Sequence, residues 1–335
     1  MDRSVTRRGP IGLVLPTFVQ DTAPPWARDP TGGDRPPDRR GTADPIEGLT
    51  QLCHQAEQMG VDGLWVCDHL FWNGPCLEAL AVLAVAATST RRVTLGTCVL
   101  QLPLRQAPAV AKQAATLQIL TRGRFVLGLG VGSHVGEYEQ AGIDYHTRGR
   151  QLDAGIAELR RAWATGGTIT DGHPSGGDDR YRQLPAPPAI PVWVGGSSEA
   201  ALRRAAALAD GWMPLFLSPI EYREALERLA KEVDRAGRAA DEVTPSIVLF
   251  VSIDSDPAVA RDRGTEWMSS LYGIPAKAFD RHLVSGTAAE VAAVVTAFHQ
   301  AGAEHVAVYV TEDQPLESLE RLMAALPVAG MPTPG

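Results

Sequence analysis

Residues 123–133 read GRFVLGLGVGS, a run of bulky apolar residues that passes into glycines. Continuous apolar residues are typical of a strand covered on both faces, and glycines at its end let the backbone come close to a flat ligand. The stretch therefore predicts a buried strand that ends at an open mouth. Its Gly-x-Gly-x-Gly spacing differs from the Gly-x-Gly-x-x-Gly of dinucleotide-binding folds, so a tight strand exit without a ligand is the alternative.

The alternation of strand and helix occurs eight times along the chain. A βα unit repeated in this way is what a (β/α)₈ barrel requires, so we predict an α/β protein with the TIM-barrel fold. The predicted strands are Ile11–Leu15, Val61–Cys67, Val93–Val99, Arg124–Leu129, Ile190–Val194, Gly211–Pro214, Ser246–Ile253 and His305–Val310.

Three polar segments interrupt the alternation, at 21–44, 166–189 and 254–286, after strands one, four and seven. We expect a single barrel domain over residues 1–335 that carries these segments as insertions. The first is too polar and too rich in proline to pack, so it forms either a lid or a surface ornament, and we favour the lid.

The composition limits the partners. The formal charge is −8 without a basic cluster, which argues against nucleic acid and favours a small-molecule ligand. The longest apolar stretch, 77–87, is too short to cross a membrane, and the first residues lack the apolar run of a signal peptide. We therefore expect a cytoplasmic protein with no membrane partner. The four cysteines, which include Cys67 and Cys98, show no Cys-x-x-Cys spacing and are expected to be reduced.

The carboxyl ends of the barrel strands meet at one rim, where barrels of this kind place their active sites. The residues that the predicted strands bring to this rim form the candidate site. They are Asp68, His69, Cys98, Val99, Gly132, Ser133, Gly195, Gly196, Ser197 and Met213.

His69 is the strongest candidate for proton transfer, because imidazole titrates near neutral pH and a strand end exposes it to a ligand. Asp68 either orients His69 or holds the ligand. The alternative is a hydrogen-bonded rim histidine without chemistry. Gly195, Gly196 and Ser197 leave backbone amides at a helix start, which favours a phosphate, although an ordinary turn with a serine cap is the alternative.

Two hydrolytic functions that barrels also carry fit the sequence less well. A metal hydrolase needs clustered ligands, and the eight histidines show neither a His-x-His nor a His-x-x-x-His pair, so we expect no metal. A glycosidase needs two facing carboxylates at strand ends, and only Asp68 is well placed.

Several motifs together resemble the bacterial luciferase-like superfamily of flavin and deazaflavin oxidoreductases, whose members are barrels with an insertion after strand seven. The resemblance runs from about Gly9 to Leu326. The motifs are Asp68-His69, Leu95-Gly96-Thr97-Cys98-Val99 with Pro103 and Pro108, Thr121-Arg122-Gly123-Arg124-Phe125, Thr147-Arg148-Gly149-Arg150 and Pro191-Val192-Trp193-Val194-Gly195-Gly196.

The resemblance implies that a flavin or deazaflavin ring lies in the barrel mouth with its phosphate near Gly195, Gly196 and Ser197. It also implies a cis peptide bond between Cys98 and Val99. In deazaflavin-dependent relatives an Asp-His pair lies against the cofactor, so the resemblance assigns acid or base catalysis to His69 during hydride transfer.

One departure from the family bears on the substrate. The sugar-phosphate dehydrogenases place a glutamate after the glycine that corresponds to Gly132, and this chain has Ser133 there. We therefore expect a substrate other than a sugar phosphate. The predicted substrate contacts are Phe18, Trp72, His134 and Glu137.

The leading hypothesis is an oxidoreductase that uses coenzyme F420 to reduce a C=C or C=N bond or to oxidise an alcohol in a specialised small molecule. An FMN-dependent monooxygenase supplied by a separate flavin reductase is the first alternative, and a non-catalytic flavin-binding barrel is the second. The composition, rich in Ala and Arg, hints at an actinobacterial source, and the resemblance favours a homodimer.

Overall fold

The structure is a computed structural model that describes residues 9–18, 44–164, 184–312 and 315–327. Its strands are β1 (Ile11–Leu15), β2 (Gly63–Val66), β3 (Thr94–Thr97), β4 (Leu100–Gln101), β5 (Phe125–Gly130), β6 (Val192–Gly195), β7 (Gly211–Met213), β8 (Thr244–Ile253), β9 (Leu283–Gly286) and β10 (His305–Val310). Its α-helices are α1 (Pro45–Gln58), α2 (Ala79–Ser89), α3 (Ala107–Leu120), α4 (Val135–Gln140), α5 (Arg148–Trp163), α6 (Glu199–Leu208), α7 (Pro219–Arg235), α8 (Pro257–Tyr272), α9 (Ala288–Gln300) and α10 (Pro315–Ala325).

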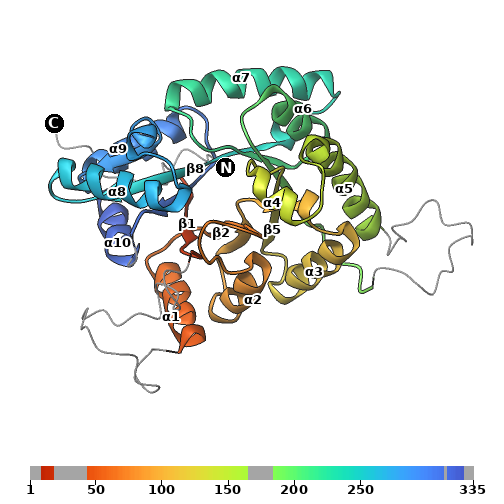
Figure 1. The fold of residues 1–335 in the computed structure, drawn as a ribbon, viewed down its shortest axis with the longest axis horizontal. Helices are drawn as coiled ribbons and strands as arrows, with labels where there is room; N and C mark the ends of the chain where they lie inside the picture. The colour runs from red at the N-terminus through yellow and green to blue at the C-terminus, as the bar shows by residue number, and fades with distance from the viewer. Residues whose placement is uncertain (1–8, 19–43, 165–183, 313–314, 328–335) are drawn as a thin grey trace, which may run out of the picture.

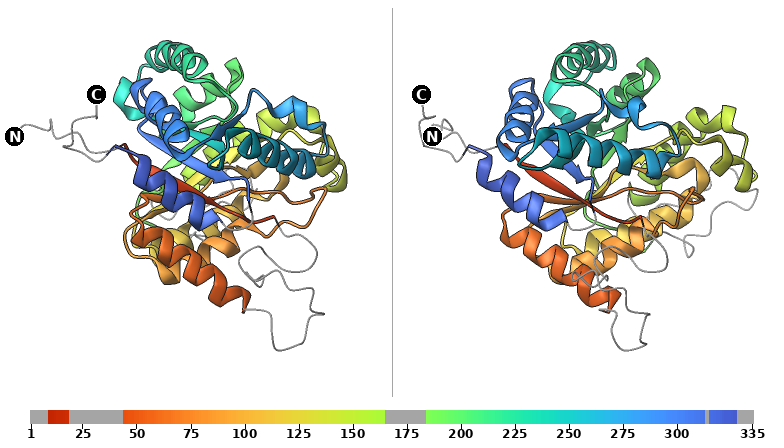
Figure 2. Two further views of the ribbon diagram at one scale, coloured as in Figure 1. Left: turned by 90° about the vertical axis from the view of Figure 1, so that its left-hand side faces the viewer. Right: turned by 60° about the vertical axis from the view of Figure 1, so that its left-hand side comes forward.

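The strands form a closed parallel barrel, with the larger helices arranged around it (Figure 1). The sheet order is β10-β1-β2-β3-β5-β6-β7-β8, and the pairing of β10 with β8 closes the ring. The side views show the same arrangement of helices outside strands (Figure 2). The predicted TIM barrel is confirmed, and all eight predicted strands are present with boundaries that differ by a few residues at most.

Helix starts follow local sequence. Ser218 and Glu221 form a capping box at the start of α7, and Thr287 and Glu290 form one at the start of α9. Such reciprocal bonds satisfy amides that have no partner inside a helix. At the start of α1 the side chain of Asp44 accepts a hydrogen bond from the Ile46 amide at 2.8 Å, which caps the helix.

The predicted third insertion, 254–286, contains the helix α8 and the strand β9. Strand β9 pairs in parallel with the last four residues of β8, from Phe250 to Ile253. Residues 21–43 and 166–183 of the other two predicted insertions lie outside the described residues, and so does the proposed lid. Among the described residues, no helix combines the length and the apolar character that a membrane crossing needs.

Aromatic side chains fill the barrel interior. The rings of Trp65 and Trp193 stack with centroids 5.0 Å apart, and the Trp65 indole donates a hydrogen bond to His305 at 2.8 Å. A Cβ atom at Gly12 or Gly96 would lie within 2.5 Å of the Trp65 ring. Glycines in these strands therefore make room for large interior side chains.

Candidate active site

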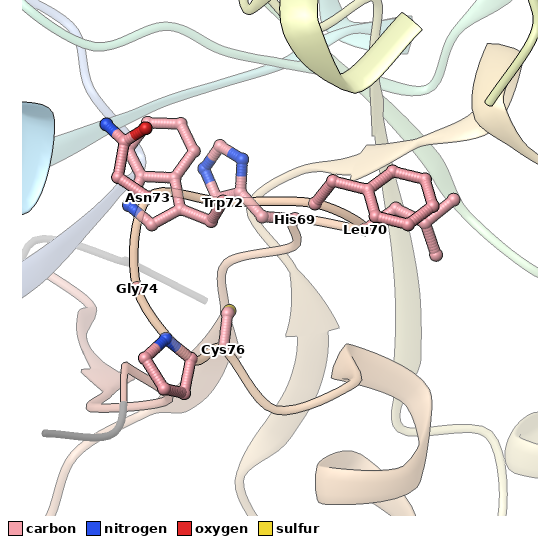
Figure 3. A pocket seen from close by; sticks show the side chains of 8 residues that line it. His69, Leu70, Trp72, Asn73, Gly74 and Cys76 are labelled. Carbon is pink, nitrogen blue, oxygen red and sulfur yellow. The ribbon is translucent and has the colours of Figure 1, made fainter. Parts of the chain in front are cut away.

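His69 follows β2 at the carboxyl end of the barrel. Its Nδ1 atom lies 3.0 Å from Oε2 of Glu137, and its side chain is 21% exposed. The ring lines a pocket of about 450 Å³ formed by residues 69–76 of the β2–α2 loop. Figure 3 shows the imidazole beside the indole of Trp72 on this loop. One edge of the imidazole thus meets a carboxylate, while the ring borders a pocket.

Glu137, from α4, is fully buried and accepts hydrogen bonds on both oxygens. Its Oε1 accepts from the amides of Leu70 and Phe71, at 2.9 and 3.1 Å. Its Oε2 accepts from Nε2 of Gln101 at 3.1 Å, besides facing His69. Burial opposes ionisation, but these bonds, led by the one with His69, outweigh it and lower the pKa of Glu137. We expected Glu137 to contact a substrate; the structure instead buries it behind the imidazole.

The carboxylate determines which nitrogen of His69 carries the proton. A carboxylate only accepts hydrogen bonds, so the Nδ1 atom of His69 is the donor to Glu137. In the neutral ring the other nitrogen, Nε2, is then an unprotonated acceptor. No side chain or backbone group among the residues that the structure describes bonds to this Nε2 atom. It is therefore free to exchange a proton with a ligand.

The sequence left two roles open for Asp68, orienting His69 or holding the ligand, and the structure pairs it with Arg105. Its two oxygens accept from the guanidinium of Arg105 at 2.6 and 2.8 Å, and Oδ2 also accepts from the Gln101 amide at 2.9 Å. The side chain is fully buried and forms no hydrogen bond with His69. Orientation of the imidazole thus falls to Glu137, and Asp68 joins the β2 end to the segment after β3.

Gln101 and Arg105 are site residues that the sequence reasoning missed. The Nε2 atom of Gln101 donates to the Asp68 carbonyl at 3.0 Å and to Glu137, so one amide bridges the two acidic residues. A Cβ at Gly132 would lie 1.8 Å from Oε1 of Gln101. The available signal was a single polar residue inside the apolar run from Val99 to Leu104.

Comparison with known proteins identifies the family. The luciferase-like monooxygenase family matches residues 27–272. The chain belongs to this family. The phthiodiolone/phenolphthiodiolone dimycocerosates ketoreductase of Mycobacterium kansasii is 29% identical over 67% of this chain and 68% of its own length. An F420-dependent glucose-6-phosphate dehydrogenase of Kribbella flavida is 31% identical over 65% of this chain and 69% of its own length.

Solved structures share the fold. An F420-dependent secondary alcohol dehydrogenase, in complex with an F420-acetone adduct, superposes with a TM-score of 0.77 at 17% identity over 95% of this chain and 98% of that one. The oxygenating constituent of 3,6-diketocamphane monooxygenase from Pseudomonas putida, in complex with FMN, gives 0.69 at 16% identity over 96% and 99%. The fold of this luciferase-like chain is thus shared by F420 and FMN proteins.

The cis peptide bond between Cys98 and Val99, which the family resemblance predicted, is confirmed. Cys98 is buried, and its sulfur lies 3.9 Å from the sulfur of Cys67. A Cβ at Gly130 would lie 2.4 Å from the Val99 side chain, and one at Gly195 would lie 3.0 Å from it.

These contacts correct the interpretation of the glycine-rich stretch. We expected its glycines to admit a flat ligand. A Cβ at Gly128 would instead lie 1.9 Å from the carbonyl oxygen of Thr97, and Gly130 and Gly132 accommodate Val99 and Gln101. The glycines therefore make room for the neighbouring segment from Thr97 to Gln101, and the ligand prediction does not follow from them.

The predicted phosphate position lies between β6 and α6. Gly196 is exposed with φ +96°, and Ser197 is half-buried before the cap residue Ser198. Of the other predicted cofactor contacts, Ser133 is exposed, whereas Met213 is 1% exposed and packs in the barrel interior. The chain is thus exposed at Gly196, just before α6, whereas the Met213 side chain is not accessible from the mouth.

The predicted substrate residues Phe18, Trp72 and His134 gather around His69. Ring centroids are 3.8 Å apart for His69 and Trp72, 5.8 Å for His69 and Phe18, and 5.2 Å for Trp72 and His134. Across the described part of the chain, no three His, Cys, Asp or Glu side chains form a group that could hold a metal ion. The chemistry available here is that of an imidazole, with its carboxylate, among aromatic rings.

Proposed function

We propose that this protein is an F420-dependent oxidoreductase that interconverts an alcohol and a ketone in a small organic substrate, with His69 as the acid or base. The observation that carries the proposal is the hydrogen bond from Nδ1 of His69 to the buried Glu137, which leaves Nε2 for the substrate. The relatives support it, because a ketoreductase and F420-dependent dehydrogenases belong among them.

In alcohol oxidation the cofactor, His69 and Glu137 have separate roles. When bound, F420 would supply the hydride chemistry, as the acceptor of one hydrogen with two electrons from the carbinol carbon. Nε2 of His69 accepts the hydroxyl proton, and the ketone is formed. Glu137 stabilises the imidazolium that results, because its carboxylate faces Nδ1–H. In the reduction direction the same imidazolium returns the proton to the oxygen.

The residues present fit such a cofactor at two points. The amides and hydroxyls of Gly196, Ser197 and Ser198 open the ten-residue helix α6, where the helix dipole favours a phosphate. The pocket beside His69, at about 450 Å³, lies within the range of small-molecule sites. The proposed cofactor contacts remain Asp68, His69, Cys98, Val99, Gly132, Ser133, Gly195, Gly196 and Ser197. Asp68 and Cys98 are buried, so they act on the cofactor through the residues that they position.

Equilibrium titration of the purified protein with oxidised F420, reduced F420 and FMN tests the proposal. We expect F420 to bind at least about tenfold more tightly than FMN, a difference of about 1.4 kcal/mol. Preferential binding of FMN, or binding of neither cofactor, would contradict it.

The FMN-dependent monooxygenase is the second candidate function. The likeness to the FMN-bound diketocamphane monooxygenase component over 96% of this chain favours it. In that case a flavin reductase is the required partner, because reduced FMN and O₂ are then the reactants. Oxygen consumption with chemically reduced FMN distinguishes the two functions.

The proposal includes a homodimer in the cytoplasm. The family resemblance supports the dimer, and four free cysteines support a reducing compartment. Light scattering coupled to gel filtration measures the assembly, and a monomer across the working concentration range would contradict it.

A further inference from the structure

The environment of His69 is aromatic on several sides. Trp72 lies at the centre of the group, with ring centroids 3.8 Å from His69, 6.0 Å from Phe18, 5.2 Å from His134 and 5.6 Å from Tyr272. These rings come from four parts of the chain: the end of β1, the β2–α2 loop, the start of α4 and the end of α8. Segments far apart in the sequence therefore contribute the same kind of side chain around one imidazole.

The indole of Trp72 is held in place. Its Nε1–H donates to the carbonyl oxygen of Leu271 at 3.0 Å, which joins the β2–α2 loop to α8 in the insertion after strand seven. The side chain is half-buried and forms part of the pocket wall beside His69 (Figure 3). A fixed, partly exposed ring costs little conformational entropy when a ligand packs against it.

Among the residues that the structure describes, the charged side chains that adjoin His69 are already engaged. Asp68 is bonded to Arg105 through both oxygens, and both oxygens of Glu137 accept hydrogen bonds. Arg105 is 12% exposed and also lies 3.8 Å from Glu78. A charged group on a ligand beside His69 would thus lose water without gaining any of these partners, which is unfavourable.

From these contacts we infer the substrate class: an uncharged alcohol or ketone whose reacting carbon bears an aromatic or alicyclic ring. The ring packs against the indole of Trp72, and the oxygen faces Nε2 of His69. This inference rests on the proposed function for the identity of the reacting group. The ring and charge preference rests on the aromatic group and the paired charges.

Three ketones that differ in one feature each test the inference. Acetophenone carries a ring without charge, 4-acetylbenzoate adds a carboxylate to the same ring, and acetone lacks the ring. Oxidised F420 has no hydride to give to a ketone, so calorimetry can measure dissociation constants without turnover, with oxidised F420 present and absent. We expect acetophenone to bind at least about tenfold more tightly than either of the others.

Variants locate the preference. Trp72→Leu is expected to weaken acetophenone binding by about tenfold, and Trp72→Phe, which keeps a ring, by less than about threefold. Trp163→Leu is the matched control, because the Trp163 indole also donates to a backbone carbonyl, that of Ala111 at 3.1 Å, but lies in α5 away from the pocket. This control is expected to leave acetophenone binding unchanged.

Each outcome decides something. Equal or tighter binding of 4-acetylbenzoate, equal binding of acetone, or no ketone binding at all would overturn the inference. So would equal losses in the Trp72→Leu and Trp163→Leu proteins, and if Trp72→Leu does not fold, the wild-type ranking and Trp72→Phe still decide. Failure of F420 to bind would refute the proposed function alone, since the ketone ranking without F420 tests the substrate class separately.

Discussion

Two histidines at opposite ends of the barrel strands show how partner and position decide the role of the same side chain. His305 begins β10, is 7% exposed, and accepts a hydrogen bond from the Trp65 indole at 2.8 Å. Burial lowers the pKa of His305 to about 3. His69 follows β2, is 21% exposed, and faces the Glu137 carboxylate.

The difference lies in what each ring nitrogen faces. His305 uses Nε2 to accept from a neutral indole inside the barrel, so protonation would remove an acceptor and bury a charge. His69 uses Nδ1 to donate to a carboxylate, which stabilises a proton arriving at Nε2. The first histidine is a packing residue, and the second has the arrangement that proton transfer requires.

Substitution of His69 gives the largest expected effect. His69→Ala is predicted to lower kcat by about 10²- to 10⁴-fold, because the substrate oxygen loses its proton acceptor. Affinity for F420, measured by titration, is expected to change little. His305→Gln, which keeps an acceptor for Trp65, is the matched control and should retain kcat within about threefold. Equal losses in both variants would break the comparison.

Glu137→Gln tests the hydrogen bond that distinguishes the two histidines. The amides of Leu70 and Phe71 require an oxygen at one end of the new side chain, so its NH₂ group faces Nδ1 of His69. This forces the tautomer with hydrogen on Nε2, and kcat for alcohol oxidation should fall about 10²-fold. Nitrogen-15 spectra of His69 report the tautomer directly. Retention of both the Nδ1–H tautomer and full activity would remove Glu137 from its positioning role.

Gln101→Leu removes one donor from Glu137 and is expected to act less strongly. We predict a kcat loss of about tenfold. We also expect activity to appear only at higher pH than in the wild type, because without the Gln101 donor the Glu137 carboxylate stabilises the protonated form of His69 more strongly. Gln118→Leu is the control: Gln118 is also buried, and bonds Ala189 and Phe125 at the other end of β5. If the two variants lose the same stability and show the same pH profile, Gln101 is only structural.

The last prediction concerns stability and leaves activity unchanged. The pKa of His305 lies near 3 in the folded protein and near 6.5 when unfolded, so between these values the unfolded chain binds a proton that the folded chain does not. The free energy of unfolding therefore falls as pH decreases, by up to about 1.4 kcal/mol per pH unit from this group. Urea unfolding of wild type and His305→Gln at several pH values should show a shallower acid loss in the variant. Parallel curves would contradict it.

Much of the fold follows from local sequence patterns. Aliphatic runs such as Ile11–Leu15 and His305–Val310 have the predicted boundaries, since buried parallel strands need continuous apolar residues. The segment after strand seven was predicted only as an insertion. Its strand β9 forms because β8 extends to Ile253 and offers a free edge, a tertiary condition that local sequence does not contain.

From the sequence, site residues could be predicted only where the end of a strand by itself places the side chain at the rim. His69 was found in this way. The partner of His69 was not, because Glu137 lies 68 residues further on and reaches the imidazole through α4. Similarly, the pairing of Asp68 with Arg105 depends on the path of the chain after β3. Side chains that act through a second side chain carry no local sequence signal.

The most direct test of the central claim is rescue of the His69→Ala enzyme by imidazole, followed through the absorbance of oxidised F420 during oxidation of an uncharged secondary alcohol such as 1-phenylethanol. If His69 transfers the proton, added imidazole restores turnover in proportion to its unprotonated form, while His305→Gln gains nothing. A His69→Ala enzyme with wild-type turnover, or one whose lost activity does not respond to imidazole although F420 and the alcohol still bind, would contradict the account.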